Sequence, residues 1–232
     1  FVVAHRGGAA EAPENTSAAF RRAAARGFPW AECDVRALRD GTPVVVHDSS
    51  VRLDGEASHR EVDTLSGEEW DRVDLASTIG PAAAGERPPR LAELLVGVRG
   101  AMKWMIEIKP VSNADAFGAV VARLVRSILP TDAYVLASFS PHILRGAESA
   151  TPDASLMGLL DVGDAPEIFD GLAIGSYGVA VEAATPSFMA AAKAEGRVVW
   201  SWTVKDLDSA RRLVKAGVVG LISDIPTAVS NF

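Results

Sequence analysis

The sequence has a single cysteine and no excess of basic charge. The 232 residues include one cysteine, Cys33, which excludes an internal disulfide and a cysteine-based zinc site. We expect Cys33 to be a small buried apolar residue. The net charge is -7, from 23 basic and 30 acidic residues, and no basic stripe is present. The sequence therefore argues against nucleic acid as a partner, whereas a small anionic substrate stays open because one site's charge need not follow the net charge.

Long apolar runs and histidine metal motifs are also missing. No uninterrupted apolar stretch reaches the roughly 20 residues that a membrane-spanning helix needs, so we expect no integral membrane segment. The chain as given favours a cytoplasmic protein, but it begins with Phe1 rather than methionine, and a removed signal peptide leaves secretion open. Neither HxH nor HExxH occurs, which gives a histidine-dominated zinc site little support.

Short apolar strands alternate with alanine-rich amphipathic stretches along most of the chain. The 48% of hydrophobic residues are enough for a sizeable core. Near-continuous apolar strands separated by helices predict a covered parallel sheet, and about eight such units predict an α/β fold, the (β/α)8 TIM barrel, as a single domain over residues 1–232. Nine strands are candidates for these eight places: 1–5, 30–35, 43–48, 104–109, 134–139, 155–160, 178–184, 197–204 and 218–224.

Two stretches depart from this alternation. The weakest strand candidate is "SLMGLL" at 155–160, and the link "ALRDGTP" after the second strand is too short and turn-like for a helical crossover. We therefore expect the barrel to be least regular at that link. Residues 49–90 are polar, carry glycine and proline, and hold only a short helical candidate near 66–73. Long loops of this kind predict a small insertion over the C-terminal face of the barrel.

Carboxylates occupy positions where a barrel strand would normally be apolar. Glu32 and Asp34 share one face of a strand because side chains alternate along it, and Glu107 stands near the end of a later strand. Bare carboxylates inside a barrel are costly unless they bind a cation or pair with bases. Three at the C-terminal strand ends suit Mg2+ or Ca2+. The alternative is ion pairing with nearby bases: Arg6, Arg36, Lys103 or Lys109.

Two histidines and two cations are predicted at the same end of the barrel. His5 ends the first strand and His47 ends the third, so we expect them at equivalent strand ends beside the carboxylates. Imidazole titrates close to neutral pH, which suits a paired general acid and base, and zinc ligation is the alternative. With Arg6, Lys109 and a divalent cation the centre would carry one net positive charge, which favours a monoanionic phosphodiester. For each cation the alternative is an ordinary surface or ion-pairing role.

Six short motifs occur in a fixed order along the chain. They are "AHRGG", "APENTSAAF", "AECDVRALRDGTPVVVHD", "IEIKP", "ASFS" and "WTVKD". Together they resemble the signature of the glycerophosphodiester phosphodiesterase family, whose barrel is similar to that of phosphatidylinositol-specific phospholipase C. The resemblance runs from Ala4 to Asp224 and is weakest over 49–90.

This resemblance implies hydrolysis of a small-molecule glycerophosphodiester to glycerol 3-phosphate and an alcohol, with one divalent cation, Mg2+ or Ca2+. It implies that the glycerol 2-hydroxyl is the nucleophile, giving a cyclic phosphate that water then opens. The implied catalytic residues are His5 and His47. The implied cation ligands are Glu32, Asp34 and Glu107. The implied substrate-binding residues are Arg6, Lys109, Phe139 and Trp202, although a barrel aromatic is as often core.

Some features leave the substrate open. Lys205 stands where the family usually has asparagine, and the stretch after "HD" departs from the family pattern. A lysophospholipid phosphodiesterase (phospholipase D-like) and a non-catalytic barrel that binds a phosphorylated ligand are the alternatives, and the oligomeric state is not predicted. Glu14 and Asn15 are expected to organise the first loop and helix cap, and Asp48 to neighbour His47.

Overall fold

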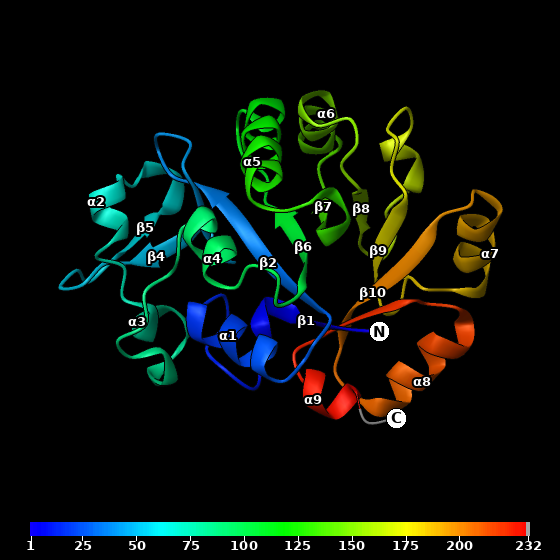
Figure 1. Cartoon of the computed structure of the whole chain (residues 1–232), viewed down its shortest axis with the longest axis horizontal. Helices are drawn as coiled ribbons and strands as arrows, with labels where there is room; N and C mark the ends of the chain where they lie inside the picture. Colours follow the sequence, from blue (N-terminus) through cyan, green and yellow to red (C-terminus); the bar gives the residue numbers. More distant parts are fainter. Residues whose placement is uncertain (231–232) are drawn as a thin grey trace.

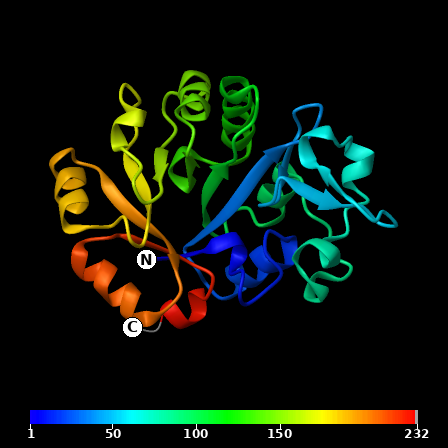
Figure 2. The same cartoon turned by 180° about the vertical axis from the view of Figure 1, so that it is seen from behind.

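Eight parallel strands form a closed barrel in the computed structural model, which describes residues 1–230 apart from the side chain of Thr78 (Figure 1, Figure 2). The first strand pairs with both the last and the second, which closes the sheet. The barrel strands are β1 Val2–Ala4, β2 Trp30–Ala37, β6 Lys103–Ile108, β7 Tyr134–Ser138, β8 Leu156–Leu160, β9 Ser176–Ala180, β10 Val198–Val204 and β11 Gly220–Ser223. The predicted (β/α)8 barrel is therefore confirmed.

Helices cover the outside of the barrel (Figure 1). They are α1 Ser17–Ala25, α4 Leu91–Gly97, α5 Ala114–Ile128, α6 Pro141–Ala150, α7 Pro186–Ala194, α8 Leu207–Ala216 and α9 Pro226–Val229. The crossover between β8 and β9 carries only a 3-10 helix, η5 Pro166–Phe169. Thr16 caps α1, because its hydroxyl accepts the backbone N–H of Ala19 at 3.1 Å. Across the described residues, every helix is too short or too polar to cross a membrane.

The strand candidate at 43–48 lies outside the barrel, directly after the link where the barrel was expected to be least regular, whereas the weakest candidate, 155–160, provides a barrel strand. The last three residues of β2, Val35 to Ala37, pair antiparallel with β3 Pro43–Val45. A link of only a few residues permits a hairpin but not a parallel crossover. The segment "SLMGLL" instead forms the barrel strand β8. Its glycine, which weakens the strand pattern, is needed because a Cβ on Gly158 would lie 2.6 Å from the ring of Phe169.

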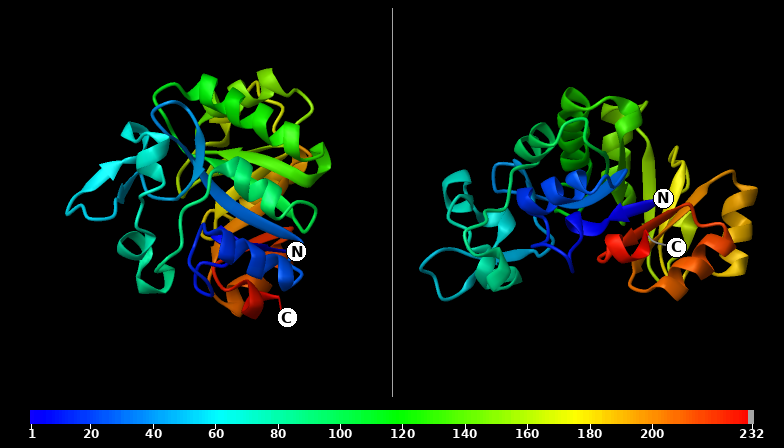
Figure 3. Two further views of the ribbon diagram at one scale, coloured as in Figure 1. Left: turned by 60° about the vertical axis from the view of Figure 1, so that its left-hand side comes forward. Right: turned by 60° about the horizontal axis from the view of Figure 1, so that its bottom comes forward.

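Residues 49–90 form a compact lobe beside the C-terminal end of β2 (Figure 3). Its apolar side chains cluster with Leu38, Val44 and Val46 from the preceding hairpin, and Trp70 is fully buried among them. The helix expected near 66–73 is shorter, because α2 begins after the Ser66 cap and ends at Trp70. The lobe consists of β4 Ser50–Arg52, β5 His59–Glu61, η2 Val62–Thr64, α2 Gly67–Trp70, α3 Leu75–Ile79 and η3 Pro81–Ala83.

Apolar side chains fill most of the barrel interior. They are Val3, Met105, Val135, Ala137, Met157, Leu159, Trp200 and Ile222, all buried. Cys33 points to the opposite face of β2, where it is fully buried in the layer between strands and helices, as expected. The buried acidic side chains Glu32, Asp34 and Glu107 lie toward the C-terminal face of this interior.

Candidate active site

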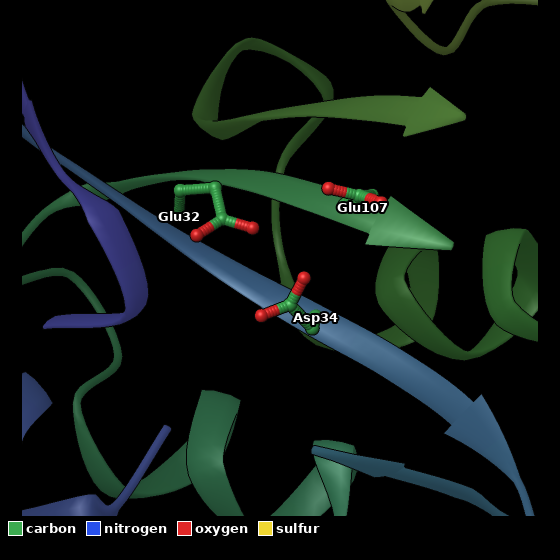
Figure 4. A group of neighbouring side chains, drawn as sticks. All are labelled: Glu32, Asp34 and Glu107. Atoms are coloured by element: carbon green, nitrogen blue, oxygen red, sulfur yellow. The ribbon is translucent and has the colours of Figure 1, made fainter. Parts of the chain in front are cut away.

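Three carboxylates from two neighbouring strands converge at the C-terminal end of the barrel (Figure 4). Glu32 and Asp34 share one face of β2, and the parallel register sets Asp34 opposite Glu107 of β6. One oxygen from each carboxylate lies within 4.8 Å of the other two. Glu32 and Asp34 are 1% and 0% exposed, and Glu107 is 8% exposed. Such a group of oxygens could hold a divalent cation.

Asp34 is the most heavily paired of the three. Its oxygens lie 2.8 Å from Nζ of Lys109 and 3.1 Å from Nε of Arg6. Asn15 donates from Nδ2 to the same carboxylate at 2.8 Å. Burial disfavours the charged form, but Lys109 and Arg6 outweigh it and hold the pKa of Asp34 well below its usual range. Asp34 therefore forms the ion pairs that were the alternative to a cation site, with Arg6 and Lys109 among the four candidate bases.

Glu32 is the carboxylate that the protein leaves incompletely paired. Its Oε2 accepts the backbone N–H of Arg6 at 2.9 Å, while its buried Oε1 has no hydrogen-bond partner within residues 1–230. Burial and the charge of Asp34 raise the pKa of Glu32 to about 8. A buried oxygen without a partner costs free energy that a bound cation would offset. The residues present therefore fit a divalent cation.

Glu107 is held by a single cation, Lys109, whose Nζ donates to Oε1 at 2.5 Å. Burial and then the charge of Asp34 raise the pKa of Glu107. The other two bases considered as partners lie elsewhere. Lys103 is 3.9 Å from Asp132 at the opposite end of β6, and Arg36 donates from Nε to the carbonyl of His47 at 2.8 Å.

His5 follows β1 directly and is tied to the last strand. Its Nδ1 lies 2.5 Å from Oδ1 of Asp224, and its Nε2 lies 3.8 Å from Oε2 of Glu32. Burial lowers the pKa of His5, but the hydrogen bond to Asp224 and the charge of Glu32 outweigh it, so the pKa is raised. The sequence reasoning gave Asp224 no role. Its position after β11, the strand beside β1, was the available signal.

His47 reaches the site by a different route from the one expected. It does not end a barrel strand; it comes two residues after the antiparallel strand β3. The hairpin folds back along the extended end of β2, and this return carries His47 to the cavity. Its Nδ1 lies 3.0 Å from Asp48, and both side chains are more exposed than the His5 pair, at 36% and 56%.

Arg6 stands in a left-handed turn, with φ of 52°, between β1 and α1. Its Nη1 is 3.0 Å from Glu14, so Glu14 braces the guanidinium while Asn15 braces Asp34. The next residue must be small, because a Cβ on Gly7 would lie 2.7 Å from the Cβ of Ala19. Glu14 and Asn15 thus organise the first loop as expected, although the helix cap itself is Thr16.

A cavity of about 240 Å³ brings the charged groups and an apolar wall together. Phe139 and Trp202 meet edge to face on that wall, with ring centroids 5.7 Å apart. None of the residues described between 49 and 90 lines the cavity. The lining residues are His5, Arg6, Glu32, His47, Met105, Glu107, Lys109, Phe139, Leu159, Trp202, Thr203 and Ile222. Asp34 lies beneath this lining.

The two remaining histidines and Lys205 lie outside the cavity. His59 is exposed on β5, and His142 is exposed on α6 with Nδ1 3.5 Å from Asp115. Lys205 is exposed directly after β10, next to the lining residues Trp202 and Thr203 on that strand. The cavity therefore takes its two histidines from the first and third strand candidates alone.

Comparison with known proteins gives a consistent result. A model of the glycerophosphoryl diester phosphodiesterase family matches residues 5–228. A glycerophosphodiester phosphodiesterase of Caldanaerobacter subterraneus subsp. tengcongensis is 29% identical, over 100% of this chain and 96% of the relative. A solved Oleispira antarctica phosphodiesterase, in complex with the product sn-glycerol-3-phosphate, is similar at a TM-score of 0.89 and 25% identity, over 99% of this chain and 94% of that one.

A second solved structure agrees. The glycerophosphodiester phosphodiesterase of Agrobacterium tumefaciens str. C58 gives a TM-score of 0.83 and 26% identity, over 100% of this chain and 99% of that one. These similarities extend over nearly the full length of both chains. The family model matches all but the first few and last few residues. The chain therefore belongs to the glycerophosphoryl diester phosphodiesterase family, as its sequence motifs predicted.

Proposed function

We propose that the chain, acting as one domain over residues 1–232, hydrolyses glycerophosphodiesters to glycerol 3-phosphate and an alcohol with the help of one divalent cation. The observation that carries this proposal is that two histidines line one cavity together with two carboxylates of the cluster, Glu107 and Glu32, whose buried Oε1 has no hydrogen-bond partner among the described residues. Binding alone needs no pair of proton carriers. The family membership and the product bound by the Oleispira relative support the same reaction.

Glu32, Asp34 and Glu107 are the residues that would hold the cation. An all-oxygen donor set favours Mg2+ or Ca2+ over softer metals. When bound, the cation supplies Lewis-acid stabilisation of charge on a non-bridging phosphoryl oxygen. Asp34 is held in place by its ion pair with Lys109. The unpaired Oε1 of Glu32 is available to bind the cation.

The histidines are the proposed proton carriers. His5 and His47 line the same cavity from separate elements, so one can take a proton from the attacking oxygen while the other gives one to the leaving oxygen. Arg6 and Lys109 line it too, and their cationic groups offset negative charge developing at phosphorus. The alternative role of these two cations, ion pairing with carboxylates, is compatible with this one, since both hold Asp34 in place.

The apolar wall suits the carbon skeleton of the substrate. Phe139 and Trp202 are half-buried and face the cavity, and Trp202 is fixed by a hydrogen bond from its Nε1 to the carbonyl of Gly178 at 3.2 Å. Glycerol presents one edge of C–H groups and one edge of hydroxyls. We place the C–H edge against these rings and the phosphate against the charged side.

The test is direct measurement of glycerol 3-phosphate released from glycerophosphocholine with Mg2+ or Ca2+. His5→Ala and His47→Ala are expected to lower turnover at least ~100-fold while the chain stays folded. His59→Ala is the matched control, since His59 is exposed outside the cavity. Near-normal turnover in either cavity variant contradicts the acid/base assignment. Absence of product from the unaltered protein contradicts the proposed reaction and favours the binding barrel.

A further inference from the structure

The two cavity histidines share a geometric feature: each has an aspartate at Nδ1. His5 faces Asp224 at 2.5 Å and His47 faces Asp48 at 3.0 Å. A carboxylate only accepts hydrogen bonds, so the Nδ1 atom facing it must carry the proton. The nitrogen left for proton exchange with a ligand is then Nε2. For His5, Nε2 points toward the carboxylate cluster, 3.8 Å from Glu32.

Asp224 is fixed in place far more firmly than Asp48. Its carbonyl accepts the backbone N–H of Ala10 at 3.0 Å. The preceding residue, Ser223, is fully buried, donates to the carbonyl of Val204 at 2.6 Å and accepts the N–H of Ile225 at 3.1 Å. Asp224 is thus held to the first loop through Ala10, and its neighbour Ser223 is held to β10 and to the cap residue of α9, so its carboxylate has little freedom to leave His5.

The barrel closure itself creates the pair. Ala4 of β1 and Ser223 of β11 are register partners, so the next residue on each strand, His5 and Asp224, emerges side by side at the C-terminal face. Burial opposes the charged form of Asp224, but the hydrogen bond with His5 outweighs it and lowers the pKa of Asp224, which favours the carboxylate. By contrast, Asp48 is 56% exposed and is the chain neighbour of its histidine.

We propose that Asp224 is the positioning residue of His5, holding the ring in the Nδ1–H form with Nε2 directed into the cavity. The expected effect of Asp224 on turnover rests on the proposed function. The orientation of the His5 ring follows from the geometry alone. Asp224 does not touch the reacting atoms. It acts through His5, as an acceptor that selects one tautomer and one orientation.

The first test is independent of activity. Ring 15N NMR of the histidines in the unaltered protein is expected to show His5 protonated at Nδ1. In Asp224→Asn the amide can donate to Nδ1, so we expect the neutral ring to shift toward the Nε2–H form. An unaltered protein with the proton of neutral His5 on Nε2, or a variant spectrum unchanged at His5, overturns the proposal.

The second test is kinetic, with glycerophosphocholine as the substrate. Asp224→Asn is expected to lower kcat about 10- to 100-fold and to change KM little, because proton transfer is impaired and binding is not. Asp224→Glu, which keeps the acceptor, is expected to recover part of kcat. Glu11→Gln is the control: its carboxylate also joins the first loop to α9, through Thr227, and its ion pair is with Arg22 rather than with His5.

The outcomes separate the two proposals. An inactive unaltered protein overturns the proposed function, and the NMR experiment then still decides the pairing. An active protein whose kcat is unaffected by Asp224→Asn overturns the positioning role. Equal losses of kcat in Asp224→Asn and Glu11→Gln also overturn it, because they would indicate a general disturbance of the loop rather than an effect on His5.

Discussion

Asp34 of β2 lies directly opposite Glu107 of β6 in the parallel register, and Nζ of Lys109 contacts both carboxylates, at 2.8 Å and 2.5 Å. Glu32, on the same face of β2, has no such contact with Lys109 in the described structure. The three carboxylates are therefore unequal. Asp34 and Glu107 are held by the protein, and Glu32 keeps one oxygen free.

This inequality predicts effects of different size on the free energy of unfolding when no divalent cation is present. Asp34→Asn is expected to lower the free energy of unfolding by about 3 kcal/mol, because it leaves the cations of Lys109 and Arg6 without their buried partner. Glu32→Gln is expected to change it by less than about 1 kcal/mol, since a neutral amide can still accept from the N–H of Arg6. Chemical denaturation in chelator measures both. Equal destabilisation by the two changes would contradict the unequal pairing.

Cation removal is expected to abolish turnover and lower thermal stability together. We expect chelator to reduce glycerol 3-phosphate release at least ~100-fold, because stabilisation of several kcal/mol is lost from the reacting phosphate. Adding Mg2+ or Ca2+ in excess is expected to raise Tm, since an ion that binds only the folded chain stabilises it. Glu107→Gln is expected to weaken that rise, and Glu61→Gln, an exposed carboxylate on β5, is not. Unchanged Tm and activity in chelator would argue against the cation.

Acid is expected to loosen the contact between the first loop and α9. Glu11 accepts from both N–H and hydroxyl of Thr227 and lies 2.7 Å from Arg22. Burial opposes its charge, but these hydrogen bonds outweigh it and lower the pKa of Glu11. A carboxyl with a lowered folded pKa contributes stability that is present above its unfolded value and lost as the pH falls through the folded one.

Glu11→Gln is therefore expected to cost about 1 kcal/mol at pH 7 and progressively less below about pH 4. Denaturation of the unaltered and variant proteins at several pH values measures the difference. A cost that stays constant from neutral to acid pH would show that the charge of Glu11 is unimportant. Asp206→Asn gives a comparison at the exposed cap of α8, where the carboxylate accepts the backbone N–H of Ser209.

Water-soluble diesters are expected to be better substrates than lysophospholipids. An enzyme that binds lipid needs an apolar surface at the cavity mouth, and none of the residues described between 49 and 90 lines the cavity. Leu65, Trp70 and Leu75 are buried in a separate apolar cluster, and Ile79 is half-buried against it. We expect kcat/KM for glycerophosphocholine to exceed that for lysophosphatidylcholine, with no stimulation by phospholipid vesicles. The reverse preference would support the lysophospholipid alternative.

Much of this protein was determined by local pattern in the sequence. Alternating strands and amphipathic helices specified the barrel, because continuous apolar strands can be buried only between covered faces. The two-residue period of a strand set Glu32 and Asp34 on one face, and the ordered motifs identified the family. These features depend on neighbours along the chain, so they can be read without coordinates.

Only the tertiary structure decided which distant groups meet. Asp224 contacts His5 because the last strand closes against the first, and His47 reaches the cavity because β3 turns back along β2 rather than joining the barrel. The pairing of Asp34 with Lys109 likewise depends on the register between β2 and β6, and the contact of Glu32 with Arg6 depends on the pairing of β1 with β2. Strand pairing is a non-local choice made by packing and closure, and no short window of sequence encodes it.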